Sequence, residues 1–190
     1  TLTGQMKNIK TYITVLGLLI TLSFSFTACN DVEDPPAPNE EELITTVKLT
    51  FTNAADSSDI RTFTFADPDG EGGNAPTIMD TIRLAANSTY KLSTQFLDES
   101  DPNDKENITE EVREEANEHL VCYTVSRETT LIRTDKDGNN LELGLKADVT
   151  TKNSGYELFT VSLKHQPSIK NGTCDVGETD VEVAFVLEIE

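Results

Sequence analysis

Short stretches in which apolar and polar side chains alternate recur along most of this chain, and they restrict its fold more than any other feature of the sequence. The clearest one runs from Leu141 to Val149, where every second residue is apolar. Because successive side chains of a β-strand point to opposite faces, such alternation predicts strands with one buried face. Comparable stretches lie at residues 43–51, 63–65, 78–84, 90–96, 159–163 and 181–189, with weaker ones at 120–125 and 130–133.

Turn-forming residues separate these stretches, as at Asp137–Asn139 and Asn153–Gly155. A helix is expected only between Asn107 and His119, where apolar residues recur at helical spacing and Asn107 with Glu110 can form a capping box. We therefore predict that residues 43–190 form a single, mainly β domain. The expected architecture is an antiparallel β-sandwich of immunoglobulin-like or Greek-key type, with about eight or nine strands and one short helix.

The stretch from Met6 to Ala28 has the three-part pattern of a secretion signal. Two lysines near its start precede an apolar run, residues 13–26, and small residues follow that run. The run is too short to cross a bilayer comfortably. We therefore expect residues 1–28 to be a signal peptide that the mature protein lacks, and residues 1–5, which precede the first methionine, not to be native protein.

The residues Phe26-Thr27-Ala28-Cys29 resemble the lipobox of bacterial lipoproteins, in which a signal peptidase cuts before the cysteine and its thiol receives diacylglycerol. The resemblance implies that Cys29 is lipidated and anchors the protein in the outer membrane. The alternative is an ordinary signal peptide followed by a free cysteine. Residues 29–42 are acidic and contain prolines, which predicts a semi-extended tether. The acidic residues directly after Cys29 resemble the surface-export signal of Bacteroidota lipoproteins, which favours the cell surface over the periplasmic face.

The charge of the chain excludes one class of partner. It carries 34 acidic and 15 basic residues, for a net charge of −19. Such a chain repels phosphate backbones and has no basic patch, so we expect no nucleic-acid partner. The sequence contains no GxSxG, HExxH or phosphate-binding glycine motif and only two histidines. We therefore expect a protein that is not an enzyme.

The stretch from Asp67 to Asn74 alternates oxygen donors with glycines, as calcium-binding loops do. Its candidate ligands are Asp67, Asp69 and Glu71. The twelfth position, where an EF-hand has a bidentate glutamate, is Ile78, so an EF-hand is excluded. Another kind of calcium loop and a solvated loop between two strands both remain compatible with this stretch.

The two histidines form a second candidate site. By its parity His165 continues the apolar face of its strand, while Glu118 and His119 end the expected helix. If these two ends meet, His119, His165 and Glu118 supply the imidazole and carboxylate ligands that suit a transition metal or haem iron. The alternative is that both histidines are only hydrogen-bonded. A divalent metal or calcium is thus the candidate cofactor, and its identity stays open.

Cys122 and Cys174 are the cysteines that remain after Cys29. Outside the cytoplasm an even number of cysteines suggests a disulfide, which here would close a loop of about fifty residues. Free thiols and metal ligands are the alternatives. A metal that used both cysteines would replace the disulfide.

The lipobox, the acidic tether, and residues 67–76, 108–119 and 177–183 together resemble small Bacteroidota lipoproteins. Such proteins are sometimes labelled with a type 1 periplasmic binding fold and can occur near TonB-dependent receptors. That fold needs two large α/β lobes, which a strand-dominated chain of this length cannot supply. The resemblance implies a non-enzymatic binding module that captures a metal or metal complex for a TonB-dependent receptor. The alternative is a structural or adhesive surface lipoprotein that binds another envelope protein.

Overall fold

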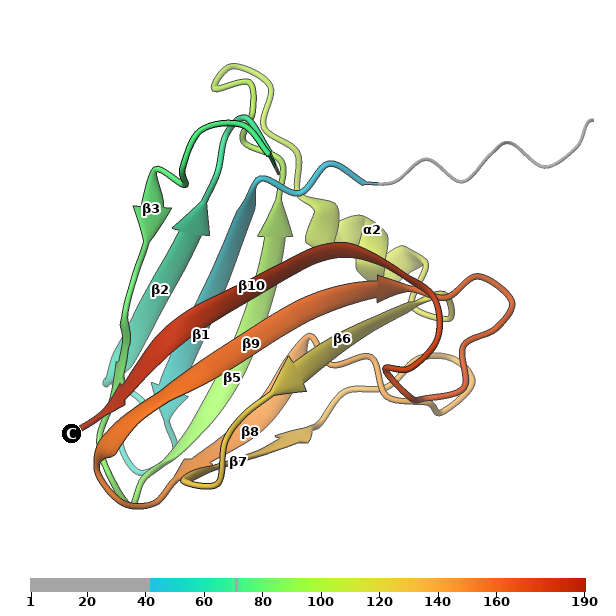
Figure 1. The fold of residues 1–190 in the computed structure, drawn as a ribbon. Helices are drawn as coiled ribbons and strands as arrows, with labels where there is room; N and C mark the ends of the chain where they lie inside the picture. The colour runs from blue at the N-terminus through green and yellow to red at the C-terminus, as the bar shows by residue number, and fades with distance from the viewer. Residues whose placement is uncertain (1–41, 71) are drawn as a thin grey trace, which may run out of the picture. The chain divides into compact units, whose positions relative to one another are not determined.

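The computed structural model describes residues 42–70 and 72–190. They form two facing β-sheets and one short helix (Figure 1). The expected mainly β sandwich is therefore confirmed. The expected signal peptide, Cys29 and nearly all of the expected tether lie outside the described residues, as does Glu71 of the candidate calcium loop.

The first sheet has six strands, and every neighbouring pair in it is antiparallel. Across the sheet the order is β3 (Ile78–Met79), β2 (Ile60–Ala66), β1 (Thr46–Asn53), β5 (Thr89–Leu97), β8 (Lys146–Thr151) and β7 (Thr129–Arg133).

The second sheet has four strands, in the order β4 (Ile82–Leu84), β10 (Glu178–Ile189), β9 (Gly155–His165) and β6 (His119–Thr124). Its edge strand β4 runs parallel to β10, and the other pairs are antiparallel. The helix α2 (Ile108–Glu114) lies at the end of the sandwich where β9 finishes and β6 begins (Figure 1).

The core lies between the two sheets and is built from the residues whose alternation predicted strands. Phe51 of β1 is fully buried, and its ring centroid lies 5.9 Å from that of Phe159 in β9. It also makes an edge contact with Tyr90 of β5 at 6.3 Å. Burial of large aromatic side chains from both sheets stabilises the sandwich, since each contributes roughly 2 kcal/mol or more of transfer free energy.

The stretch from Leu141 to Val149 is not one continuous strand, and on this point the prediction was wrong. Only its second half belongs to β8. Gly144 has a φ of 90°, a conformation that favours glycine, and it interrupts the extended backbone. The preceding carbonyl of Leu143 accepts a hydrogen bond from Val121 in the second sheet, and the carbonyl of Leu145 accepts one from Thr94 in the first. The chain therefore crosses between the sheets here, although Leu143 and Leu145 are buried as their alternation predicted.

The stretch at residues 78–84 is also divided. Ile78 and Met79 pair with β2 at the edge of the first sheet, while Ile82 to Leu84 pair with β10 in the second. Ile78 and Met79 are 44 % and 51 % exposed, whereas Ile82 and Leu84 are fully buried, so only the second half of the stretch contributes to the core as the alternation predicted.

The helix α2 is shorter than expected, since β6 already begins at His119. Asn107 is its N-cap residue but makes no side-chain capping bond; its amide instead donates to Glu110. The helix is held by Ile108, Val112 and Thr109, which are buried. The hydroxyl of Thr109 donates to the carbonyl of Phe96 in β5 and accepts from its N–H, at 3.0 and 2.9 Å.

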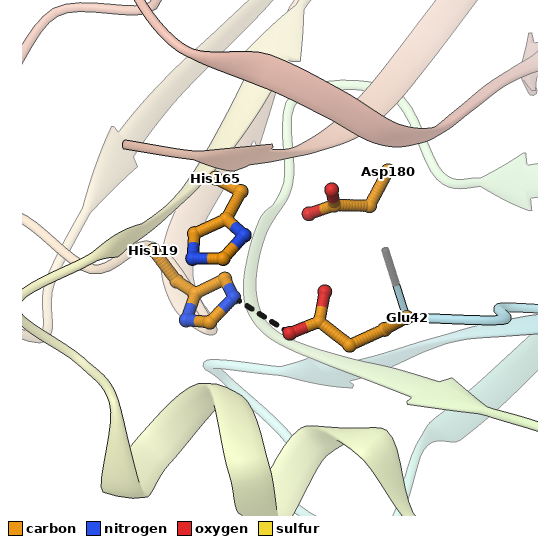
Figure 2. Close-up of side chains that lie close together, drawn as sticks. All are labelled: Glu42, His119, His165 and Asp180. Atoms are coloured by element: carbon orange, nitrogen blue, oxygen red, sulfur yellow. Dashed lines mark hydrogen bonds and ion pairs between the residues drawn. The ribbon is translucent and has the colours of Figure 1, made fainter. Parts of the chain in front are cut away.

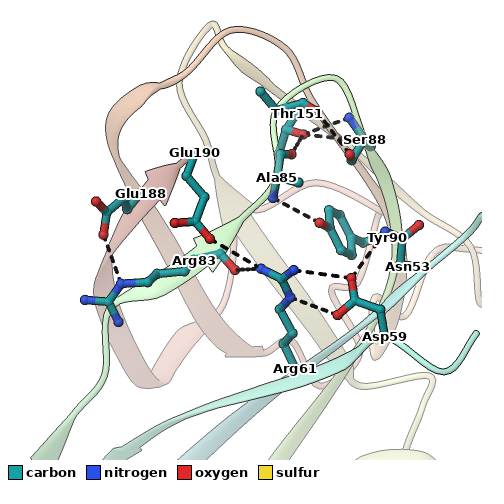
Figure 3. Close-up of polar contacts among 11 residues, drawn as sticks. Asn53, Asp59, Arg61, Arg83, Ala85, Ser88, Tyr90, Thr151, Glu188 and Glu190 are labelled. Carbon is teal, nitrogen blue, oxygen red and sulfur yellow. Dashed lines mark hydrogen bonds and ion pairs between the residues drawn. The ribbon is translucent and has the colours of Figure 1, made fainter. Parts of the chain in front are cut away.

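Polar contacts close the opposite end of the sandwich, where β10 finishes (Figure 3). Arg61 of β2 donates to Asp59 and to the main-chain carbonyl of Arg83 in β4, so it joins the two sheets. The Tyr90 hydroxyl accepts a hydrogen bond from the Ala85 N–H at 3.0 Å. No helix among the described residues is both long enough and apolar enough to cross a bilayer.

Candidate metal centre

The two histidines lie directly opposite each other on neighbouring strands. His119 begins β6, His165 ends β9, and the two are partners in the antiparallel register. Their rings are stacked, with centroids 4.5 Å apart and planes inclined by 15°. Both point into the sandwich and are buried, His119 completely and His165 to within 2 %. The parity that placed His165 on the apolar face is therefore what brings the two rings together.

A hydrogen bond fixes the orientation of the His119 ring. Its Nδ1 lies 3.2 Å from the main-chain oxygen of Glu115, just after α2. A carbonyl oxygen can only accept, so Nδ1 carries a proton, and Nε2 is the nitrogen that can face a ligand. Metal-binding histidines commonly use their second nitrogen in this way, because the bond holds the tautomer and the ring direction.

Two carboxylates complete the cluster (Figure 2). Glu42, in the chain that leads into β1, places Oε1 3.1 Å from Nε2 of His119. Asp180 lies in β10 at a register irregularity between Thr179 and Val181. Such a bulge can re-aim a side chain, here toward the histidines. One donor atom from each of Glu42, His119, His165 and Asp180 lies within 4.8 Å of the other three.

The spacing of these donors suits a metal ion. In a tetrahedral zinc site with bonds of about 2.0–2.1 Å, neighbouring ligand atoms lie about 3.4 Å apart. The four donors need to approach one another by no more than about 1.4 Å to reach that geometry. Two imidazoles with two carboxylates are a donor set for a first-row transition metal, because calcium and magnesium take oxygen ligands.

The charges of the cluster also point to a cation. Burial raises the pKa of Glu42, but the hydrogen bond from His119 and the positive charge of the histidines outweigh burial and hold that pKa below its ordinary value. Burial lowers the pKa of His119, yet the Glu42 carboxylate outweighs it and raises that pKa. In addition, Oε2 of Glu42 is buried and accepts no hydrogen bond from the described residues. A dication would balance both carboxylates and use this oxygen.

The loop after β9 holds His165 and Asp180 in place. Gln166 donates from its N–H to the Glu118 carbonyl, and its side-chain amide donates to the carbonyls of Thr173 and Val176. A disulfide joins Cys174 of this loop to Cys122 of β6, with the two Cα atoms 6.0 Å apart. The two cysteines that the sequence offered for a disulfide are thus bonded in this structure, and neither is a metal ligand.

Further acidic side chains surround the cluster. Glu111 and Glu115 of α2 form a second group with Glu42, with donor atoms again within 4.8 Å of one another. Burial and the neighbouring charges of Glu42 and Glu115 raise the pKa of Glu111. Carboxylates gathered at one place attract cations from solution.

Glu118, the carboxylate that the sequence suggested beside the histidines, lies outside the cluster. Its Oε2 is 3.8 Å from Nε2 of His165, and its side chain is 46 % exposed. The sequence analysis missed Glu42 because it assigned that residue to the end of the tether. It missed Asp180 because only the bulge in β10 turns this residue toward the histidines, and a bulge leaves no clear mark in a sequence rich in acids.

Of the three candidate calcium ligands, the structure describes Asp67 and Asp69. The Asp69 carboxylate accepts hydrogen bonds from the main chain and the side-chain amide of Asn74, at 2.8 and 2.7 Å. Asp67 and Asp69 belong to neither group of clustered donors found in the part of the chain that the structure describes. In this structure Asp69 serves as the hydrogen-bonding centre of a turn.

A cavity of about 380 Å³ adjoins the metal cluster. Its walls include Glu42 and Asp180 of the cluster, Leu43 and Ile44 next to Glu42, and Asp67 of the neighbouring loop. The cavity lies beside the chain that leads into β1, which therefore separates it in part from the histidines. A scan of protein-family models and searches of curated proteins and of solved structures found no match to this chain.

Proposed function

We propose that this domain binds a divalent transition-metal ion through Glu42, His119, His165 and Asp180 and carries it as cargo. The observation that supports this is the convergence of two buried imidazoles and two carboxylates within 4.8 Å. Buried charged groups are costly unless they are compensated, and a dication compensates both carboxylates. All four donors come from the protein, which suits holding an ion more than catalysis, since catalytic zinc sites keep a position open.

The resemblance to Bacteroidota lipoproteins extends the proposal to the cell envelope. With Cys29 lipidated, the domain would be held at the outer membrane by its acyl chains. A TonB-dependent receptor is the partner that this resemblance suggests for receiving the ion. In this proposal the protein captures metal and performs no reaction on it.

The test is to titrate the purified full-length chain with Zn²⁺ and, separately, with Co²⁺, whose visible d–d bands report coordination. We expect one ion per chain and a spectrum typical of nitrogen and oxygen ligands. The near-isosteric variants Glu42→Gln and Asp180→Asn should each weaken binding by more than about 100-fold, because they remove direct ligands rather than outer contacts.

Two variants serve as matched controls. Glu182→Gln changes a carboxylate of β10 that lies two residues from Asp180 and belongs to neither donor group. It should leave the affinity unchanged. Glu118→Gln, beside His165, should weaken binding by about tenfold at most, as loss of an outer contact does. Equal binding by the wild type, Glu42→Gln and Asp180→Asn would show that the ion does not use this cluster.

One observation favours a second, adhesive function. Leu158 of β9 and Val186 of β10 are direct neighbours on the outer face of the second sheet, and they are 57 % and 44 % exposed. Tyr156, two residues before Leu158 in β9, is 73 % exposed. Exposed apolar side chains that adjoin one another suit a protein partner. Co-purification from native envelopes of an envelope protein that is lost with Leu158→Lys, together with failure to bind metal, would favour this function.

A further inference from the structure

The donor atoms of the cluster are closed off from water. Oε2 of Glu42, both carboxylate oxygens of Asp180 and Nε2 of His165 have almost no solvent-accessible area. The His119 side chain is likewise fully buried. An ion cannot reach or leave such a site unless part of the protein moves.

Three of the four ligands are on strands that cannot move easily. His119 pairs with His165 in the second sheet, and Asp180 lies in β10, which pairs with β9 along most of its length. Displacing either histidine would disturb the pairing of β6 with β9, and displacing Asp180 would disturb the pairing of β10 on both sides of the bulge. Paired strands open less readily than a segment without regular structure.

The fourth ligand is placed differently. Glu42 belongs to residues 42–45, here called the lead-in, which form no regular secondary structure before β1. The first main-chain hydrogen bond of the lead-in within the described residues is made by Thr45, whose N–H donates to the Leu97 carbonyl. Leu43 is 52 % exposed, so between Glu42 and Thr45 only the Ile44 side chain is buried in the core.

The cavity lies directly beside the lead-in. Glu42, Leu43 and Ile44 all form part of its wall, and Asp180 forms another part (Figure 2 shows Glu42 and Asp180 side by side). Displacement of Glu42 would connect the cavity with the two imidazoles. Within the lead-in, Thr45 is fixed by main-chain hydrogen bonds with Leu97 and Asp67. The part before it is held closed by the contact of Glu42 with His119 and by the burial of Ile44.

We propose that the lead-in is the gate of the metal site: the ion enters and leaves when Glu42 and Ile44 swing away, while His119, His165 and Asp180 stay in place. This gating proposal rests on the proposed function, because it assumes that the site binds a metal ion. In this mechanism Glu42 is the ligand that leaves the ion when the lead-in opens. A partner that pulled on the chain before Glu42 would thereby release the ion.

A gate has a kinetic signature that ordinary weakening of a ligand lacks. If ions pass only through a rare open state, both the association and the dissociation rate are proportional to the population of that state. Ile44→Ala removes the buried anchor of the lead-in without removing a ligand. We expect both rates for Zn²⁺, measured by stopped flow in the full-length chain with a competing chelator, to rise on the order of tenfold, while the affinity changes little.

A matched control separates gating from general loss of stability. Ile189→Ala removes another buried isoleucine, at the far end of β10, and it should leave both rates unchanged. Equal rates in the wild type and Ile44→Ala would overturn the gate. A rise in the dissociation rate alone would also overturn it, because it would mean that Ile44 only supports the ligand geometry.

A second measurement needs no metal. The chain has only His119 and His165 as histidines, and both are sealed, so the rate at which diethyl pyrocarbonate modifies a tag-free chain reports opening directly. We expect slow modification of the wild type, modification about tenfold faster in Ile44→Ala, and no acceleration in Ile189→Ala. If no ion binds, the proposed function fails, but this measurement still shows whether the lead-in opens. Equal modification rates in all three proteins would overturn the gate.

Discussion

Thr109 of α2 takes the place of a neighbouring strand for Phe96 of β5. Its hydroxyl accepts from the Phe96 N–H and donates to the Phe96 carbonyl, and the contact is buried. One side chain thereby satisfies both main-chain groups of a core residue and joins the only helix among the described residues to the first sheet. Because His119 follows that helix closely, the contact also helps to place this residue of the candidate metal site.

Replacing Thr109 by valine, which has nearly the same shape, should destabilise the protein by roughly 2 kcal/mol or more, since it leaves a buried N–H and a buried carbonyl unpaired. Thr109→Ser keeps the hydroxyl and should lower the free energy of unfolding clearly less than Thr109→Val does. Urea unfolding at neutral pH measures the difference. Equal stability of the two variants would contradict the assigned hydrogen bonds.

A buried ion pair predicts a dependence of stability on pH. Nζ of Lys170 lies 2.8 Å from Oδ2 of Asp137, with the two side chains 3 % and 0 % exposed. Burial raises the pKa of Asp137, but the hydrogen bonds from Lys170 and from the Leu141 N–H outweigh it and hold the pKa below its ordinary value. The stability that this pair contributes is therefore present above about pH 4 and is lost as the pH falls through the lowered pKa.

We accordingly expect Asp137→Asn to destabilise the protein by roughly 3 kcal/mol at pH 7, because it leaves the Lys170 ammonium buried without its carboxylate. The difference from the wild type should shrink between pH 4 and pH 2. Denaturant unfolding across this range gives the profile, with the exposed Asp104→Asn as control. A difference that stays constant down to pH 2 would exclude the ion pair as its cause.

The disulfide between Cys122 and Cys174 spans 52 residues. Closing a loop of this length restricts the unfolded chain and stabilises the fold by about 4 kcal/mol on the chain-entropy model. The Cys122→Ala, Cys174→Ala double variant should therefore show a clearly lower melting temperature, and reductant should lower that of the wild type but not that of the variant. If reductant leaves the melting temperature of the wild type unchanged, that result would argue against the disulfide.

Gly144→Ala should destabilise the protein by at least about 2 kcal/mol, through its positive φ and a steric clash. A Cβ at this position would lie 2.6 Å from the Val121 main-chain oxygen. Gly138→Ala is the matched control, because its nearest neighbour would be at 3.4 Å and its φ is not positive. Calorimetry of the two variants tests this, and a similar melting temperature for both would show that the crossing at Gly144 is wrong.

Alternation predicted most of the sheet content because it reflects which face of a strand is buried. It also predicted that His165 points inward, since His165 keeps the parity of Phe159. It did not predict where the chain changes sheets. At Gly144 the side chains keep their burial pattern while the backbone changes its partners. Between Met79 and Ile82 the backbone also changes its partners, but there Ile78 and Met79 are exposed and burial begins only at Ile82. Partner choice depends on hydrogen bonds between distant segments, which periodicity does not encode.

Half of the candidate metal site could be predicted, for a similar reason. Histidine is rare in this chain, so His119 and His165 were conspicuous, whereas Glu42 and Asp180 are two among 34 acidic residues. Glu118 was chosen because it adjoins His119 in sequence, but it lies in the turn before β6, and its side chain is 46 % exposed. The carboxylates that reach the histidines come instead from the lead-in and from a bulge.

The crossing at Leu143 and Leu145 connects the two sheets through main-chain hydrogen bonds. One carbonyl is bonded to each layer, so separating the layers would break backbone bonds as well as apolar contacts. The two sheets therefore cannot separate without the loss of these hydrogen bonds, and they should unfold together in one cooperative transition. Local opening that exposes the interior should therefore occur in segments whose main chain is not hydrogen-bonded to either sheet.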